Sequence, residues 1–408
     1  MLYLQKITRM KKLVPTYFLI LIAQIAFCQV PHLYNHTFPE VNSVDSKIEN
    51  LLQQVNCADI ISDVEYLTSY LNRRADGPYI YNVKDWLVEQ YNSFGLDSIY
   101  LHEFEVIPFW STEPRPFTTA PNVLAVQPGK SNPEEIIVCG AHFDSTVRLD
   151  EPYDVDTVYS PGADDNATGV AGILAAARIL SQYDFKRTII YANWNAEEWG
   201  LCGSSEYAKQ CAADSLDIVA YFNLDMTGYL NPGDDIHVHL LYGNKDSLLG
   251  KFVKQVGRQY LPGVKLSHAW LSGGSDTDYS SFNRNGYPAI SPSEDVNKMS
   301  PYIHSENDII GLSVNNWDQT VVFTKLNLAS VALAAGLTGE SVNENFETDQ
   351  QITSYEVYDI LGRRVYYKNN IQKNIDEISV NCLESGIYII RFFTESGKSF
   401  SKKLFLKY

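Results

Sequence analysis

Apolar residues along the chain follow two different periods, and the segments that carry them alternate. Within residues 45–95, "VEYLTSYLNRR" and "VKDWLVEQYNSFG" repeat apolar residues every three or four positions, the spacing of an amphipathic helix. Further helices are predicted over residues 168–181, 204–211, 246–260 and 315–337. Four apolar, β-branched stretches predict buried strands: "NVLAVQ", "EIIVCGAHFD", "TIIYANWN" and "IVAYFNLDM". This alternation predicts an α/β fold, a three-layer sandwich around a central, mostly parallel or mixed sheet.

The pattern changes near residue 337. The stretch "TGESVNENFETDQQ" is polar, acidic and poor in apolar residues, and we interpret residues 338–352 as a linker. Residues 353–408 then show apolar residues at every second position without helical spacing, which predicts a small all-β domain, a sandwich. The α/β domain is therefore expected to span residues 29–337.

Residues 1–28 have the pattern of a secretory signal peptide. Lys6, Arg9, Lys11 and Lys12 precede the apolar run "LVPTYFLILIAQIAFC". This run is shorter than the roughly 20 residues that a spanning helix needs, so a membrane anchor is the less favoured alternative. No later stretch is long and apolar enough to span a bilayer, and we expect no integral membrane segment after signal removal.

Composition and charge narrow the possible partners. Hydrophobic residues make up 45% of the 408 residues and charged residues 20%, which is typical of a globular protein. The net charge of −17 argues against nucleic acid or an anionic membrane as partner. Five of the six cysteines follow the signal peptide. Cys202 and Cys211 are either a local disulfide or two buried small side chains.

Five predicted loops carry carboxylates or imidazoles, and four of them follow strands or precede a helix. The residues are His142 with Asp144, Asp164 with Asp165, Glu197 with Glu198, Asp225, and His304. Such loops gather at one edge of an α/β sheet, and carboxylates that converge without Lys or Arg call for cations. Two imidazoles among carboxylates suit zinc. Each motif alone is more often a surface pair, a turn or a helix cap, so the prediction depends on their coincidence.

The spacing within two motifs suggests roles. His142 and Asp144 are two apart at a strand end and face the same side, where the carboxylate can orient the imidazole. Of the adjacent Glu197 and Glu198, one can bind metal while the other accepts a proton from water. A rival ligand pair, His237 and His239 in "HVH", has only Asp234 and Asp235 nearby in sequence and is ranked below the main group.

The ordered motifs "HFD", "PGADDNATG", "NAEEWGLCGS", "NLDMTGY" and "HSENDI" resemble those of secreted bacterial di-zinc aminopeptidases, peptidase family M28. The resemblance covers residues 45–337 and implies two Zn²⁺ per chain, with Co²⁺ or Mn²⁺ as substitutes. It implies that Asp165 bridges the metals, that His142 and Asp225 complete one site and Glu198 and His304 the other. Glu197 would be the general base towards a bridging hydroxide. The peptide bond between Asp165 and Asn166 would be cis.

The same resemblance implies peptide substrates with a free N-terminus. Apolar candidates for the pocket that holds the first side chain are Met226, Tyr279, Phe282 and Ile303, which favours hydrophobic N-terminal residues. The chain departs from the family at Thr277-Asp278-Tyr279, where relatives carry a histidine-containing "SDH". The alternatives are a glutaminyl cyclase on a related zinc scaffold, a carboxypeptidase, which the lack of Arg in the metal loops disfavours, and a binding ectodomain without catalysis.

The last 56 residues, with "YEVYDILGRRV" and "LESGIYIIRF", resemble the C-terminal sorting domain of the type IX secretion system. This implies export through the periplasm and outer membrane by that machinery, to the medium or the cell surface. An accessory β-sandwich that stabilises the enzyme or binds carbohydrate is the alternative.

Overall fold

The computed structural model describes most of the chain beyond residue 35. The described residues are 36–107, 119–148, 154–270, 276–340, 352–359, 362–369, 383, 386–395 and 399–406. The predicted signal peptide, residues 1–28, lies outside them, as does part of the predicted all-β domain, including residues 370–382. Among the described residues, no helix combines the length and the apolar character needed to cross a bilayer.

The centre of the molecule is a mixed sheet of eight strands within the described residues, in the order β1-β2-β5-β3-β6-β9-β7-β8. The neighbours β5, β3, β6 and β9 run parallel, and the remaining pairs are antiparallel except β7 with β8. The strands are β1 (Ile99–His102), β2 (Asn122–Gln127), β3 (Asn132–His142), β5 (Arg187–Trp194), β6 (Asp217–Asn223), β7 (His237–Leu241), β8 (Lys265–Ala269) and β9 (Ala289–Ser293).

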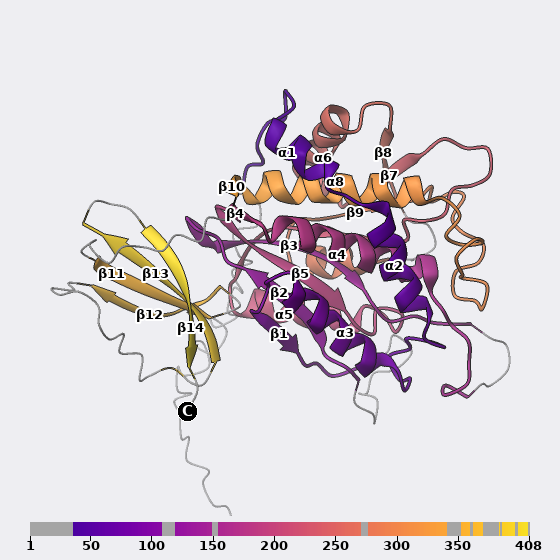
Figure 1. Ribbon diagram of the computed structural model, residues 1–408, viewed down its shortest axis with the longest axis horizontal. Helices are drawn as coiled ribbons and strands as arrows, with labels where there is room; N and C mark the ends of the chain where they lie inside the picture. Colours follow the sequence, from indigo (N-terminus) through magenta and orange to yellow (C-terminus); the bar gives the residue numbers. More distant parts are fainter. Residues whose placement is uncertain are drawn as a thin grey trace, which may run out of the picture.

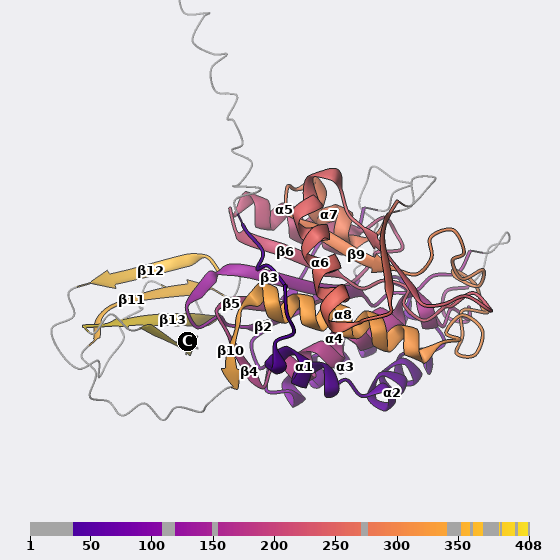
Figure 2. The ribbon, with the colours of Figure 1, turned by 90° about the horizontal axis from the view of Figure 1, so that it is seen from above.

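Helices cover both faces of this sheet, and Figures 1 and 2 show the layers. Strand side chains alternate between the faces: Val123 and Ala125 join one core, and Leu124 and Val126 the other. One face packs against α1 (Ser46–Gln53), α2 (Cys57–Thr68), α3 (Ile80–Ser93), α4 (Gly169–Leu180), α6 (Ser247–Tyr260) and α8 (Trp317–Ala335). The other packs against α5 (Cys202–Ala213) and α7 (Asp278–Arg284). The predicted three-layer α/β sandwich is confirmed.

Most elements predicted from the sequence lie where the pattern places them. The four predicted strands correspond to β2, β3, β5 and β6, and the helices predicted from residue 168 onwards to α4, α5, α6 and α8. The short strands β1, β7, β8 and β9 and the helix α7 were not predicted. The described cysteines Cys57, Cys139, Cys202 and Cys211 are all free. Because Cys202 and Cys211 lie buried on α5, they are small core side chains and form no disulfide with each other.

The parallel strands bring several loops to one edge of the sheet. The strands β3, β5, β6 and β9 all end there, because each is parallel to its neighbour. A π-helical turn, η1 (Ala163–Thr168), leads directly into α4. This edge, at the carboxyl ends of parallel strands, is where α/β proteins place their functional groups.

The C-terminal residues form a separate four-stranded antiparallel sheet in the order β12-β11-β13-β14. Its strands are β11 (Ile352–Asp359), β12 (Arg364–Asn369), β13 (Gly386–Thr394) and β14 (Ser399–Leu406). This confirms the small all-β fold predicted for the tail. It contacts the α/β part through the ion pairs Arg363–Asp214 at 2.9 Å and Arg391–Glu134 at 3.5 Å.

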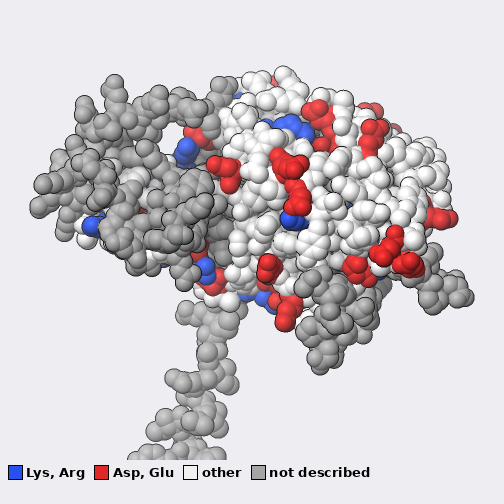
Figure 3. Space-filling model, turned by 60° about the horizontal axis from the view of Figure 1, so that its bottom comes forward, with Lys and Arg blue, Asp and Glu red and all other residues white. Residues whose placement is uncertain are grey.

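Three short elements complete the α/β part. The strands β4 (Tyr183–Phe185) and β10 (Leu337–Glu340) pair in a two-stranded sheet, and η2 (Asn244–Asp246) precedes α6. On the face shown in Figure 3, acidic side chains are scattered over the described surface and basic ones are few, which agrees with the net charge of −17.

Candidate metal centre

Three strand ends supply most of the predicted site. His142 is the last residue of β3, Glu197 and Glu198 follow β5, and Asp225 follows β6. His304 lies on the long segment between β9 and α8. The structure brings these side chains together with Asp165.

Asp165 is held by a turn that the sequence specifies closely. Gly162 has a φ of +56°, and a Cβ there would stand 2.5 Å from the main-chain oxygen of Asp165, so only glycine fits. Asn166 accepts the N–H of Gly169 at 3.0 Å, at the start of α4, and donates to the carbonyl of Leu224 at 3.0 Å. The turn is thereby fastened to both α4 and the end of β6. The Asp165–Asn166 peptide bond is cis, as the family resemblance implies.

The two oxygens of Asp165 face two different imidazoles. Oδ1 is 3.1 Å from Nε2 of His142, and Oδ2 is 2.9 Å from Nε2 of His304. His142 Nε2 is also 3.5 Å from Oδ1 of Asp225, and His304 Nε2 is 3.0 Å from Oε2 of Glu198. Ligands of a tetrahedral zinc ion are separated by about 3.3 Å, given bonds of about 2.0–2.1 Å. The spacing therefore fits one divalent ion on each side of Asp165.

Glu197 lies beside the first of these groups. Its Oε2 is 4.0 Å from Nε2 of His142, and the ligand atoms of His142, Glu197 and Asp225 all lie within 4.8 Å of one another. A second group of the same kind contains Asp165, Glu198 and His304. These distances fit Glu197 as a metal ligand and also as a general base towards water. The zinc content of a Glu197→Gln variant distinguishes the two roles.

Asp144 acts differently from the sequence-based expectation. His142 Nδ1 is 3.1 Å from the main-chain oxygen of Asp144 and 3.5 Å from its carboxylate, so the carbonyl is the group that orients the imidazole. The carboxylate instead accepts the N–H groups of Glu197 at 3.0 Å and Glu198 at 3.2 Å. Asp144 therefore fixes the backbone that carries both glutamates.

Two further residues organise the loops and were missed by the sequence analysis. Asp308 accepts the N–H of Asp164 at 2.9 Å and of Asp165 at 3.1 Å, one with each oxygen. Arg73 is fully buried and donates to the carbonyls of Phe143, at 2.9 Å, and Gly162, at 2.8 Å. Asp308 lies within the quoted motif "HSENDI", but nothing local to "NRRADG" distinguishes Arg73. Only tertiary structure brings that guanidinium beneath the cluster.

The electrostatics of the cluster favour divalent cations. Burial raises the pKa of Glu198 to about 7 and holds the pKa of Glu197 well above its ordinary value. Burial by itself lowers the pKa of His142, but the charges of Glu197 and Asp225 outweigh it and raise that pKa. The carboxylates of the cluster thus carry more negative charge than its two imidazoles can balance. Three buried ligand atoms also have no hydrogen-bond partner among the described residues: His142 Nε2, Glu198 Oε1 and Asp225 Oδ1.

The backbone around the cluster adopts uncommon conformations. Non-glycine residues with positive φ are Ala196 at 56°, Leu201 at 61°, Met226 at 56° and His304 at 55°, together with Ser215 on a distant turn. The first four flank or belong to the predicted site residues. Such left-handed residues persist where the surrounding structure holds them, which is typical of functional sites.

A cavity of about 430 Å³ opens over the cluster. Asp165, Glu197, Glu198, Asp225 and His304 line one end of it. The apolar lining residues are Leu201, Met226, Met299 and Ile303, so two of the four predicted pocket residues are present. Leu201 and Met299 were missed, because nothing in their local sequence marks them.

Tyr279 and Phe282 are absent from this lining, which corrects the prediction for both. Phe282 is fully buried and packs against Trp194 and Tyr221 in the core beneath α5 and α7. Tyr279 packs against the same core. The motif "TDYSSF" begins α7, and its helical period turns both rings towards the sheet and away from the cavity.

Two arginines line the cavity, Arg148 and Arg284, although the motif loops themselves contain none. Arg284 is engaged by Asp276, whose Oδ2 lies 2.6 Å from its Nη2. The sequence-based argument against a carboxypeptidase, the lack of an arginine near the metals, is therefore weaker than expected.

Comparison with known proteins gives concordant matches. The profile of peptidase family M28 matches residues 122–330, and that of a secretion system C-terminal sorting domain matches residues 340–407. Leucine aminopeptidase 1 of Colletotrichum graminicola is 30% identical over 328 residues, 75% of this chain and 77% of that protein. The LapA aminopeptidase of Legionella pneumophila shares 25% identity at a TM-score of 0.60, covering 75% of this chain and 79% of LapA. Porphyromonas gingivalis glutaminyl cyclase shares the fold at a TM-score of 0.56 and 19% identity, over 68% of this chain and 98% of that chain.

Proposed function

The chain belongs to peptidase family M28 and is a metallo-exopeptidase of the aminopeptidase type, and from this premise we propose that it works with two zinc ions. The observation that carries the proposal is the position of Asp165. Its two oxygens lie 3.1 Å and 2.9 Å from two different imidazoles, those of His142 and His304. A carboxylate shared between two ligand groups is what a two-metal site about 3.5–4 Å across requires.

The ligands divide naturally between the two ions. His142 and Asp225 would hold one ion, Glu198 and His304 would hold the other, and the two carboxylate oxygens of Asp165 would serve both. Cobalt or manganese can substitute, because imidazole and carboxylate ligands also suit those metals. When bound, the ions supply an acidified water and polarise the carbonyl of the scissile peptide bond.

The remaining steps belong to the side chains. Glu197 accepts a proton from the attacking water and returns it to the departing amine, as a general base and then a general acid. Asp144 keeps Glu197 in place through its 3.0 Å hydrogen bond to the Glu197 N–H. The acidic end of the cavity attracts the charged α-amino group of a peptide and so favours cleavage at the N-terminus.

Hydrophobic N-terminal residues fit the apolar wall. Met226 and Ile303 belong to it, with Leu201 and Met299, and all four lie beside the metal ligands. Burying a leucine side chain against such a wall contributes about 1.5–3 kcal/mol. We therefore assign leucyl-type peptides as the preferred substrates.

Replacing Ile303 with serine tests this wall. We expect kcat/KM for a leucyl arylamide to fall about 5–30-fold, because about 1–2 kcal/mol of apolar contact is lost, while the alanyl arylamide changes little. The matched control is Ile310→Ser on the same segment, where the side chain is exposed and outside the cavity. An equal fall in kcat/KM for both substrates would show that Ile303 does not contribute to the preference for leucine.

The activity itself is tested with two substrates and a chelator. Purified protein is expected to release arylamine from leucyl arylamide, to lose this activity on chelation, and to regain it with zinc. Glutaminyl arylamide distinguishes the rival cyclase, which shares this fold. Formation of pyroglutamyl arylamide with release of ammonia, or turnover that survives complete removal of metal, would contradict the proposal. An N-acetylated leucyl arylamide should resist cleavage, because it lacks the free amine.

The C-terminal domain matches a secretion system sorting domain, which indicates export and a secreted or surface-attached protein. We assign the type IX machinery as the partner, across the periplasm and outer membrane. The contacts Arg363–Asp214 and Arg391–Glu134 each involve a solvent-exposed side chain, and exposed ion pairs contribute at most about 1 kcal/mol. Such weak contacts are compatible with a tail that is later removed.

A further inference from the structure

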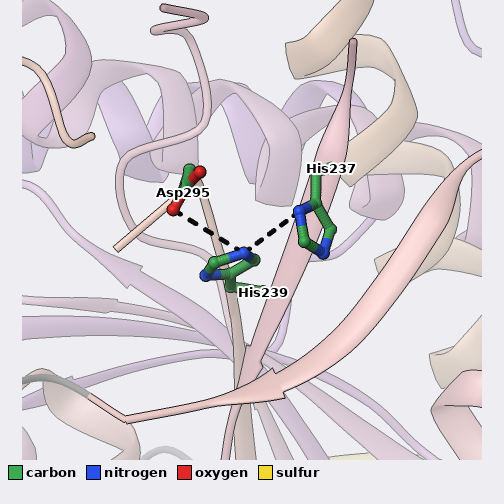
Figure 4. Close-up of side chains that lie close together, drawn as sticks. All are labelled: His237, His239 and Asp295. Atoms are coloured by element: carbon green, nitrogen blue, oxygen red, sulfur yellow. Dashed lines mark hydrogen bonds and ion pairs between the residues drawn. The ribbon is translucent and has the colours of Figure 1, made fainter. Parts of the chain in front are cut away.

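A second group of metal-type side chains lies away from the catalytic cluster. His237 and His239 stand two apart on β7 and so point to the same side of the strand. The strand β9 pairs antiparallel with β7, with His239 opposite Ser293, so Asp295 follows just beyond the paired residues. Figure 4 shows the three side chains pointing toward one another. The sequence analysis ranked His237 and His239 low because their carboxylate partner comes from a distant strand end.

The spacing of the three side chains fits one cation. His239 Nε2 is 3.2 Å from His237 Nδ1 and 3.7 Å from Asp295 Oδ1, and all three ligand atoms lie within 4.8 Å of one another. The ligand separation at tetrahedral zinc is about 3.3 Å. To come to that distance, Oδ1 of Asp295 must move closer to His239, at the expense of the hydrogen bonds that it accepts from the main-chain N–H of Asn297 at 3.0 Å and from its side-chain amide at 3.2 Å.

The surroundings prepare His237 for binding. Its Nε2 is 2.8 Å from the hydroxyl of Ser267 on β8, so the ring can donate there and leave the lone pair of Nδ1 facing the other two side chains.

A further contact, at His239, opposes binding. The N–H of Val296 donates to Nδ1 of His239 over 3.3 Å, which favours the tautomer with its proton on Nε2. A cation at Nε2 requires that proton to move to Nδ1, at the expense of this long hydrogen bond. The affinity should therefore be lower than that of a site with four protein ligands.

The site is reached from solvent through a cavity of about 790 Å³. The charged and histidine residues that line it are Asp234, Asp235, His237, Lys265, Asp295 and Lys298. Asp234 is paired with Lys298 at 2.7 Å. The cavity leaves room for a hydrated cation to enter and for water to complete its coordination, as three protein ligands require.

We propose that His237, His239 and Asp295 form an additional divalent transition-metal site of the zinc type, separate from the catalytic centre. The ion ties β7 to the first residues of the segment that leads from Asp295 to Met299, Ile303 and His304. Its role is structural, since it fixes the start of the segment that supplies one wall of the catalytic cavity.

Zinc content tests the proposal. Wild-type protein and the variants His237→Gln and Asp295→Asn are equilibrated at the same buffered micromolar free zinc, and zinc per chain is measured by mass spectrometry. We expect each variant to hold one zinc equivalent less than wild type. The matched control is His268→Gln, an imidazole on β8 that stacks on Tyr242 outside the cluster, and it should keep the wild-type content.

Equal zinc contents in wild type and in both variants would overturn the proposal. The comparison does not depend on the catalytic ions, because wild type and each variant hold the same number of them, and this number cancels when the zinc contents are subtracted. If the two-zinc aminopeptidase proposal were wrong, the zinc content per chain would change in wild type and variants alike. If the present inference were wrong, only the difference in zinc content between wild type and variants would disappear. Asp295→Asn keeps the shape of the side chain, so it serves if His237→Gln does not fold.

Discussion

Replacing Glu197 with glutamine is expected to lower kcat for leucyl arylamide by about 10²–10⁴-fold while the zinc content stays unchanged. Glutamine has the same shape and retains the hydrogen bond from its N–H to Asp144, but it cannot accept a proton from water. The effect should appear in kcat, with little change in KM, because proton transfer is needed in the transition state and not in binding. Steady-state kinetics and zinc analysis on the same preparation give both quantities.

The matched control is Glu206→Gln on the neighbouring helix α5, where the carboxylate pairs with Lys209 at the surface. It should leave both kcat and zinc content at wild-type values, since exposed pairs of this kind contribute little. Loss of one zinc in Glu197→Gln would instead make Glu197 a ligand of the ion that His142 and Asp225 are proposed to hold. The base would then have to be sought elsewhere.

Replacing Asp165 with asparagine is expected to abolish activity and to weaken binding at both metal sites together. The substitution removes a charge and turns one of the two ligand oxygens into an amide nitrogen that cannot bind metal. Because the oxygens face His142 and His304 separately, at 3.1 Å and 2.9 Å, both sites lose support. Zinc content measured over a range of buffered zinc concentrations checks the expectation.

The control is Asp276→Asn, which changes an acidic residue that lines the same cavity and pairs with Arg284 but does not approach either imidazole. It should retain the wild-type zinc content. If Asp165→Asn also retained wild-type zinc at all concentrations, Asp165 would not bridge two ions, and the proposed centre would be wrong in its main feature.

Much of the fold followed from local pattern. Apolar stretches rich in β-branched residues predicted β2, β3, β5 and β6, because strands buried on both faces, such as β2 and β5, are apolar at most positions. The strands β7 and β8 escaped prediction because they are short and contain polar residues such as His237 and Lys265, and β8 lies at the sheet edge. The residues of the candidate site were recognised because several loops with carboxylates or imidazoles coincide in one chain, although each motif alone has an ordinary structural explanation.

The pocket was harder to predict than the metal cluster. Phe282 and Ile303 look equally suitable in the sequence, yet one fills the core under α7 and the other lines the cavity. Which face of a short helix is buried depends on what packs against it, and that information lies in α5 and the sheet. The partnership of Asp295 with His237 and His239 was hidden for the same reason.

What the sequence determined by itself is the alternation of strands and helices, the turn around Gly162 and Asp165, and the identity of the side chains after each strand. These depend on neighbouring residues, through hydrophobic period and backbone freedom. Only the tertiary structure decided that Arg73 and Asp308 hold the loops, that the carbonyl of Asp144 orients His142, and which apolar residues face the cavity. Those contacts join segments far apart in the chain, and their geometry exists only once the sheet has assembled.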